Sequence, residues 1–234
     1  MSQPVTPRMQ PIRVGNVYEE TLERLLQAIR LGQFRPGEKM PPERELAESL
    51  GVSRTTLRDA LSGMQSAGYV AVARGRYGGT YVCDRLPDPS RWPGELEAGV
   101  VHDVLTTREV VEPAVSRLTA QRGISGEQMA ALRAGHQAVC DAPEHHYRPL
   151  DSRFHLMIAD LCGSPTLSNV VLQNRARVNE LLDHIPLLTP NLAHSTQQHE
   201  AILLAIEQGD GDAAAAATRE HIEGTASLLR GFLD

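Results

Sequence analysis

Residues 41–61, PPERELAESLGVSRTTLRDAL, decide how the first part of this 234-residue chain folds. Leu46 and Leu50 lie one turn apart on the apolar face of a short predicted helix, which Gly51 would end. Ser53 is then a good N-cap for a second helix, because its side chain can accept a hydrogen bond from a free backbone N–H of the first turn. Two helices joined by so tight a turn predict a helix-turn-helix.

The second helix leaves Arg54, Thr55 and Arg58 on its outer, N-terminal side. That end of a recognition helix meets base edges in the major groove of DNA. An arginine can bond guanine through O6 and N7, and such a pair is worth about 1–3 kcal/mol of discrimination between bases. These three residues are therefore candidates for reading a DNA sequence.

The flanking residues complete a winged domain. Upstream, residues 17–34 carry apolar side chains at the spacing of an amphipathic helix. Downstream, 69–72 and 80–82 are typical of two short strands, joined by the basic, glycine-rich stretch ARGRYGG, which is suited to a phosphate backbone or a minor groove. Alternatively, 53–61 is a plain surface helix with solvated arginines, but the ordered succession of helix, turn, capped helix and basic hairpin disfavours this interpretation.

Charge divides the chain more clearly than its net value of −6 indicates. Residues 1–85 hold twelve Lys and Arg against nine Asp and Glu, whereas 86–234 hold eleven against twenty together with all nine histidines. This asymmetry indicates a polyanion-binding module joined to a module of another kind. Three scattered cysteines argue against a disulfide framework and favour a reducing cytoplasm. No apolar run suits a signal peptide or a membrane span.

The pattern GxxxPGxxxPxERELAxxLGVSRTTLRxAL resembles the GntR family of bacterial transcription regulators over roughly residues 17–83. The chain departs from it at Pro42, where Ser or Ala is common, but proline is tolerated at a helix start. The resemblance implies DNA contacts from three arginines, assisted by the cap, its neighbour and the wing. The candidate DNA-binding residues are Arg44, Ser53, Arg54, Thr55, Arg58, Arg74, Gly75 and Arg76.

The proline-rich stretch LPDPSRWPGELEAG, residues 86–99, is typical of a linker. Beyond it the pattern is helical throughout, with helices predicted at 100–122, 126–140, 144–162, 166–185, 190–208 and 210–231. The expected organisation is a disordered tail (1–14), a winged helix-turn-helix domain (15–84), a linker (85–98) and an all-helical bundle of six to seven helices (99–234). The fold class is mainly α.

Asp151 and His155 fall on one stripe of the predicted helix DSRFHLMIADLC, among apolar residues. His199 and His221 lie on the inward faces of two later helices. A single histidine in such a place is most often a satisfied core residue. Together, a carboxylate and three imidazoles facing one core suit a divalent ion such as Zn, Ni, Mn or Fe.

Arg108 lies within the apolar stripe of the helix 100–122, predicted to consist of Val101, Val104, Leu105, Val111, Val115 and Leu118. A buried guanidinium needs a carboxylate partner. The first alternative is Glu112, one turn along the same helix, and the second is an acidic ligand.

The segments LTTREVVEPAVSRLTAQR, DSRFH and HEAILLAIEQGDGDAAAAATREHI resemble the FCD effector domain of the FadR-type GntR subfamily, over roughly 99–231. The resemblance implies that Asp151, His155, His199 and His221 bind a metal, zinc before nickel, manganese or iron. It implies equally that Arg108 binds a small carboxylate effector.

The expected protein is a cytoplasmic homodimer that binds a pseudo-palindromic double-stranded DNA operator, as a repressor more often than an activator, without a membrane partner. In one alternative the metal is purely structural or is itself the signal. A distant alternative is a metal-dependent hydrolase with Glu200 as base, although a helix neighbour of His199 would point elsewhere.

Overall fold

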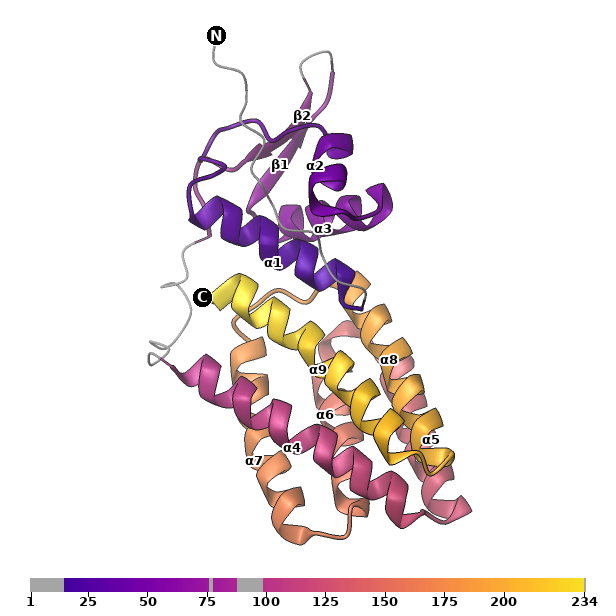
Figure 1. Cartoon of the computed structure of the whole chain (residues 1–234). Helices are drawn as coiled ribbons and strands as arrows, with labels where there is room; N and C mark the ends of the chain where they lie inside the picture. The colour runs from indigo at the N-terminus through magenta and orange to yellow at the C-terminus, as the bar shows by residue number, and fades with distance from the viewer. Residues whose placement is uncertain (1–14, 76–77, 88–98, 234) are drawn as a thin grey trace. The chain divides into compact units, whose positions relative to one another are not determined.

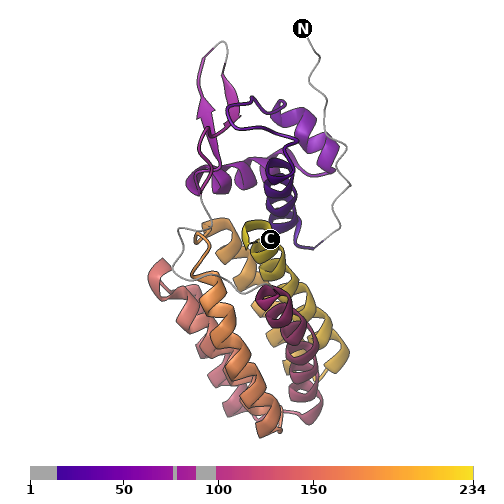
Figure 2. The same cartoon turned by 90° about the vertical axis from the view of Figure 1, so that its left-hand side faces the viewer.

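The computed structural model describes residues 15–75, 78–87 and 99–233 (Figures 1 and 2). The chain divides into two units: the described residues before Leu96 together with those from Ser227 on, and the residues Glu97–Ala226. The expected tail, most of the expected linker and Arg76 lie outside the described residues. The predicted fold class, a winged helix-turn-helix followed by an all-helical domain, is confirmed.

The first unit is built on three helices, α1 (Val17–Arg30), α2 (Glu43–Leu50) and α3 (Arg54–Ser66). α3 packs against both α1 and α2 through leucines that are almost wholly buried. Gly51 follows α2 with φ +68°, a left-handed conformation that glycine adopts without strain, and this lets the chain turn sharply into α3. The Ser53 side chain accepts a hydrogen bond from the backbone N–H of Thr56 at 3.0 Å, as an N-cap does.

The wing is an antiparallel hairpin of β1 (Val70–Ala73) and β2 (Gly79–Val82), in which Val70 pairs with Val82 and Ala73 with Gly79. The backbone of Lys39 forms a further, isolated antiparallel β-bridge with Tyr81. Gly75 has φ +106° at the tip, so a side chain there would strain the turn. The buried ends Val70 and Val82 anchor the strand pair, and Arg74 and Gly75, the described residues after β1, are exposed.

The last residues of α9 (Gly211–Leu233) belong to the first unit from Ser227 onward. Phe232 is 1% exposed, and its ring lies 5.9 Å from that of Tyr69 in an edge-to-face arrangement. Arg230 Nε lies 3.3 Å from a carboxylate oxygen of Glu23 on α1. The hydrophobic pattern alone had assigned these residues to the helical bundle, because periodicity does not reveal which core an apolar face covers.

The second unit is a bundle of long helices that lie alongside one another in both views (Figures 1 and 2). Its elements are α4 (Val100–Arg122), α5 (Gly126–Cys140), α6 (Glu144–Leu161), α7 (Pro165–Leu182), α8 (Thr189–Glu207) and α9 from Gly211. α4 packs against α6, α7 and α8, and α5 packs against α6 and α8. All six predicted helices are present, although α7 ends at Leu182 rather than at residue 185.

The inward face of α4 differs from the predicted apolar stripe. Arg108, Glu112 and Thr119 are 1%, 4% and 0% exposed, whereas Leu118 is 37% exposed. Thr119, which was not part of the predicted stripe, donates a hydrogen bond to the backbone carbonyl of Ile158 on α6 at 2.9 Å, so a polar residue faces the interior beside the exposed Leu118. Polar residues therefore form much of the contact between α4 and the interior of the bundle.

None of the helices in the described part of the chain is long and apolar enough to cross a membrane.

Candidate functional site

The four predicted metal ligands meet inside the bundle. Asp151 and His155 come from α6, one turn apart, His199 from α8 and His221 from α9. All four are buried, with between 0% and 8% of each residue exposed. One ligand atom from each side chain lies within 4.8 Å of all the others. The structure thus brings together, in one buried cluster, residues separated by up to 70 positions in the sequence.

The cluster has the spacing of a metal site. His221 Nε2 lies 3.1 Å from His155 Nε2 and 3.3 Å from His199 Nε2, while Asp151 Oδ1 lies 3.4 Å from His199 Nε2. Four ligands at about 2.0–2.1 Å from a tetrahedral Zn would lie roughly 3.3 Å apart. The observed donor set, one carboxylate oxygen and three imidazole nitrogens, therefore fits a divalent cation of borderline softness.

The outer nitrogens of two rings have partners that orient the inner ones. His155 Nδ1 lies 2.9 Å from Oε2 of Glu112, and His221 Nδ1 lies 3.3 Å from Oε1 of Gln198. A carboxylate or amide oxygen beside Nδ1 favours the tautomer that carries its proton on Nδ1, and this leaves the Nε2 lone pair for a metal. Two such lone pairs facing each other at 3.1 Å repel unless a proton or a cation lies between them. The environment of the histidines thus favours the tautomer that a metal needs.

The pKa values of the cluster also favour metal binding, because they keep the imidazoles neutral and the carboxylate ionised. Burial lowers the pKa of His199 to about 3 and holds that of His221 well below its ordinary value. Burial and the Arg175 charge also lower the pKa of His155, although Glu112 opposes them. Burial raises the pKa of Asp151, but Arg175 and the histidines outweigh it and bring that pKa to about 2. Neutral imidazoles and an ionised carboxylate are the forms that bind metal.

Arg108 lies beside this cluster and is 1% exposed. It pairs with Glu112, the first of the two partners that the sequence analysis considered. Its Nε lies 2.8 Å from Oε1 of Glu112. Burial raises the pKa of Glu112, yet the charges of Arg108 and then His155 outweigh it and lower that pKa. Arg108 Nη1, however, has no hydrogen-bond partner within the described residues. One donor of this buried guanidinium is therefore left for another group.

Arg175 on α7 also reaches the cluster, and the sequence analysis had not singled it out. It is 2% exposed and pairs through Nη2 with Oδ2 of Asp151 and, at 3.1 Å, with the hydroxyl of Ser152. Its Nε has no hydrogen-bond partner among the described residues. The signal was present in the sequence, because Arg175 lies between Val171 and Val178 on one helix face, just as Arg108 lies among valines.

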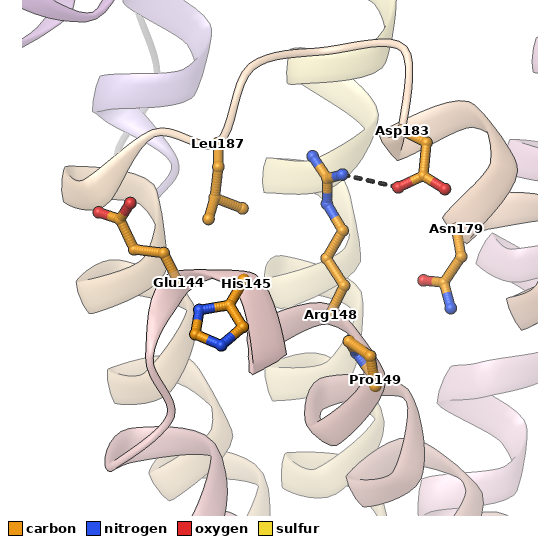
Figure 3. A pocket seen from close by; sticks show the side chains of 7 residues that line it. All are labelled: Glu144, His145, Arg148, Pro149, Asn179, Asp183 and Leu187. Atoms are coloured by element: carbon orange, nitrogen blue, oxygen red, sulfur yellow. Dashed lines mark hydrogen bonds and ion pairs between the residues drawn. The ribbon is translucent and has the colours of Figure 1, made fainter.

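A surface pocket of about 560 Å³ borders the same network (Figure 3). Arg148 reaches across it to Asp183, with Nη1 and Oδ1 2.8 Å apart, and donates to the carbonyl of Ile185. Asn179 lines the pocket and donates a hydrogen bond to Ser152 at 2.9 Å. A chain of polar contacts therefore runs from the pocket wall through Ser152 to Arg175 and the metal-type cluster. The lining residues are Glu144, His145, Arg148, Pro149, Asn179, Asp183 and Leu187.

Glu200, the base required by the hydrolase alternative, faces away from the cluster. It is exposed and contacts α5, where its carboxylate lies 3.1 Å from Arg133 and 3.6 Å from His136 Nδ1. His199, its neighbour in sequence, points inward. The cluster therefore has no contribution from Glu200 with which to activate a water molecule.

In the first unit, the residues predicted to contact DNA lie at the surface. Ser53, Arg54 and Thr55 are exposed at the start of α3, and Arg74 and Gly75 are exposed in the wing. Arg58 Nη2 lies 2.8 Å from Glu43, and Arg44 Nη1 lies 3.1 Å from Glu48. Exposed ion pairs of this kind are worth about 0–1 kcal/mol, so both arginines can exchange a carboxylate for a phosphate or a base at little cost.

Comparison with known proteins identifies both parts of the chain. Residues 17–82 match the bacterial regulatory proteins of the gntR family, and residues 103–224 match the FCD domain. The Uxu operon transcriptional regulator of Escherichia coli is 29% identical over 231 residues, which cover 92% of this chain and 87% of that protein. The HTH-type transcriptional regulator LutR of Bacillus subtilis is 25% identical over 219 residues, covering 88% and 98% of the two chains.

The solved structure of E. coli McbR/YncC matches with a TM-score of 0.52 at 19% sequence identity, over 93% of this chain and 98% of that one, and supports the fold alone. The matched families and these relatives are transcription regulators and not enzymes.

Proposed function

The chain belongs to the GntR family of bacterial regulatory proteins and carries an FCD domain; on this basis we propose that a small carboxylate, bound beside a divalent metal, sets its affinity for an operator. The family makes the chain a DNA-binding transcriptional regulator. One observation supports the finer proposal. Three histidine Nε2 atoms and the carboxylate of Asp151 lie close together in the buried cluster, next to Arg108, whose Nη1 has no hydrogen-bond partner among the described residues.

The metal would be held by Asp151, His155, His199 and His221, with zinc as the first candidate and nickel, manganese or iron as alternatives. The ligand spacing near 3.3 Å and the neutral imidazoles support this assignment. When bound, such an ion supplies the largest local positive charge of the site, and this favours an anion beside it. Glu112 and Gln198 would keep two of the imidazoles oriented.

Arg108 would bind a carboxylate of the effector. Its Nη1 is buried without a partner, and an unmade hydrogen bond of a buried charged group costs more than about 1–3 kcal/mol. A carboxylate would satisfy that donor, whereas an apolar ligand would not. The Glu112 contact at Nε does not compete with this role, because it uses another edge of the same guanidinium.

On DNA, Arg54 would read base edges with Thr55, Ser53 and Arg58, while Arg44, Arg74, Gly75 and Arg76 would contact the backbone or the minor groove. The exposure of the described members of this set supports the assignment. We propose that two copies bind the two halves of a pseudo-palindrome, because two-fold proteins match two-fold operators. The regulator would act in the cytoplasm, where bacterial DNA lies, and as a repressor.

A second candidate function follows from the charge pairing inside the bundle. Arg175 pairs with Asp151 and Arg108 with Glu112, so the buried charges are balanced with no organic ligand. In this alternative the metal itself is the signal or a structural element. Chelation would then change operator affinity with no carboxylate present.

Native mass spectrometry of the purified full chain tests the proposal. We expect a dimer with one divalent ion per chain and a small acidic mass that is lost in Arg108→Ala. Arg117→Ala is the matched control, because Arg117 lies on the same helix and is exposed. A dimer that carries no metal and also refuses added Zn, Ni and Mn would overturn the metal site. Metal-dependent operator binding that no carboxylate alters would favour the second candidate.

A further inference from the structure

Two buried guanidinium groups, from two helices, lie next to the cluster of Asp151 and the three histidines. One guanidinium would be enough to bind a single carboxylate. Arg108 comes from α4 and Arg175 from α7, and they are 1% and 2% exposed. The Arg175 charge is one of the causes, after burial, that lower the pKa of Arg108. A buried arginine is expensive to desolvate, so two of them at one site require an explanation in terms of the anions they face.

The protein itself supplies one carboxylate for each arginine. Glu112 lies 2.8 Å from Arg108 Nε, and Asp151 pairs with Arg175 Nη2. Two positive and two negative side chains balance, and the three neutral histidines add no charge. The bundle is therefore close to neutral at this point when no other charge is present.

A divalent ion on the three histidines and Asp151 would change this balance by two positive charges. Excess charge in a buried site is costly unless it is paired. A monocarboxylate would leave one positive charge uncompensated, whereas a dicarboxylate would leave none. With a divalent metal bound, the charges of these side chains therefore favour an effector that carries two negative charges.

The hydrogen-bond donors agree with the charge count. Arg108 Nη1 and Arg175 Nε are both buried without a hydrogen-bond partner among the described residues. They belong to different guanidinium groups, on different helices. A ligand with two carboxylates can therefore offer a separate carboxylate to each donor.

We propose that the effector is a short dicarboxylate whose two carboxylates are bound one by Arg108 and one by Arg175. This inference rests on the proposed function, because it assumes a metal at the cluster and an anionic effector beside it. Arg175 is then a specificity-determining residue: its charge selects two carboxylates over one. Arg175 Nη2 donates a hydrogen bond to the Ser152 hydroxyl, and that hydroxyl also accepts one from the amide of Asn179 on the pocket wall.

Matched acid pairs test the proposal on the zinc-loaded full chain. Malonate, succinate, glutarate and adipate are each compared by calorimetry with the monocarboxylate of the same carbon number, and native mass spectrometry checks that zinc is retained. We expect at least one dicarboxylate to bind about 10- to 100-fold tighter than its monocarboxylate, the usual range for an added hydrogen bond to a charged group.

Variants of Arg175 make the charge argument specific. Arg175→Gln removes one positive charge and is expected to abolish the preference for the dicarboxylate, whereas Arg175→Lys keeps the charge and most of the preference. Arg177→Gln, on the same helix but exposed and paired with Asp103 at 2.7 Å, should leave the preference unchanged.

The outcomes separate the inference from the proposed function. Equal binding of mono- and dicarboxylates would overturn the inference and leave the carboxylate effector in place. An unchanged preference in Arg175→Gln would overturn the role of Arg175. If neither class of acid binds the zinc-loaded chain, the effector function itself fails and the inference fails with it.

Discussion

Replacing Glu112 by glutamine tests how strongly the polar interior of the bundle depends on its charge pairs. Glu112 is 4% exposed and contacts Arg108 Nε at 2.8 Å and His155 Nδ1 at 2.9 Å. Glu112→Gln keeps the volume of the side chain but leaves Arg108 without a carboxylate. Removal of one partner of a buried ion pair costs about 3–5 kcal/mol. We expect the lower end, about 3 kcal/mol, because the amide oxygen can still accept a hydrogen bond.

The expected loss converts to a change in melting temperature. The second unit comprises roughly 130 residues, and an unfolding entropy of about 2.1 cal/mol/K per residue gives about 0.27 kcal/mol/K for its transition. A loss of about 3 kcal/mol therefore lowers the melting temperature of this unit by about 11 °C. Differential scanning calorimetry of the metal-free protein measures it without a contribution from metal affinity.

Two further variants make this prediction refutable. Glu109→Gln changes an exposed carboxylate on the same helix and should cost less than about 0.5 kcal/mol, or about 2 °C. Arg108→Met added to Glu112→Gln removes the unpaired charge and should recover part of the loss. Equal shifts for Glu109→Gln and Glu112→Gln would show that the Arg108–Glu112 pair contributes nothing beyond a surface charge, and the reasoning would be wrong.

Three other perturbations have expected outcomes. Ser53→Ala removes the cap on the Thr56 N–H and should destabilise the first unit by about 1 kcal/mol, measured by urea denaturation. Arg54→Ala should abolish the preference for the operator over random duplex in gel-shift titrations, with dimer and metal content unchanged; a loss of affinity that is equal for both DNAs would contradict base reading. Dialysis against a chelator should lower the melting temperature of the second unit, and re-added zinc should restore it. The free energy of unfolding should fall by about 2.7 kcal/mol if the free metal had been at 100 times its Kd.

The fold was largely predictable from the sequence, because its signals are local. Helix periodicity, the glycine after α2 and the Ser53 cap act within a few residues, and all six helices of the bundle follow from such patterns. The inward face of α4 was less predictable. A hydrophobic stripe counts apolar residues only, so it placed Leu118 inside and overlooked Thr119, which bonds to the Ile158 carbonyl.

The sequence predicted which four side chains meet in the cluster, but less of what surrounds them. Asp151 and His155 share a helix face, and the spacing of the later histidines matches a family pattern, so the four residues could be named. Arg175 was not named, although it too is an arginine in an apolar stripe. Its pairing with Asp151 depends on how α6 and α7 pack, and no local spacing encodes that contact.

The buried histidines also determine how stability depends on pH. Burial lowers the pKa of His199 to about 3 and that of His221 well below its ordinary value, whereas both have a pKa of about 6.5 in the unfolded chain. Below pH 6.5 the unfolded chain therefore binds protons that the folded bundle does not. Stability then falls as the pH falls, by up to about 1.4 kcal/mol per pH unit for each histidine. The lowered pKa of Asp151, about 2, has its effect only below about pH 4.

Between pH 7 and pH 5, His199 alone should destabilise the metal-free second unit by about 2 kcal/mol, and His221 acts in the same direction. Urea denaturation at several pH values measures this slope. In His199→Leu the slope should decrease by about 1.4 kcal/mol per pH unit, whatever the variant's stability at pH 7, because the slope counts protons and not contacts. His102→Asn, an exposed histidine on α4, is the control and should leave the slope unchanged. If the His199→Leu and unaltered chains give parallel curves, His199 binds a proton equally in both states, and its burial does not keep the imidazole neutral.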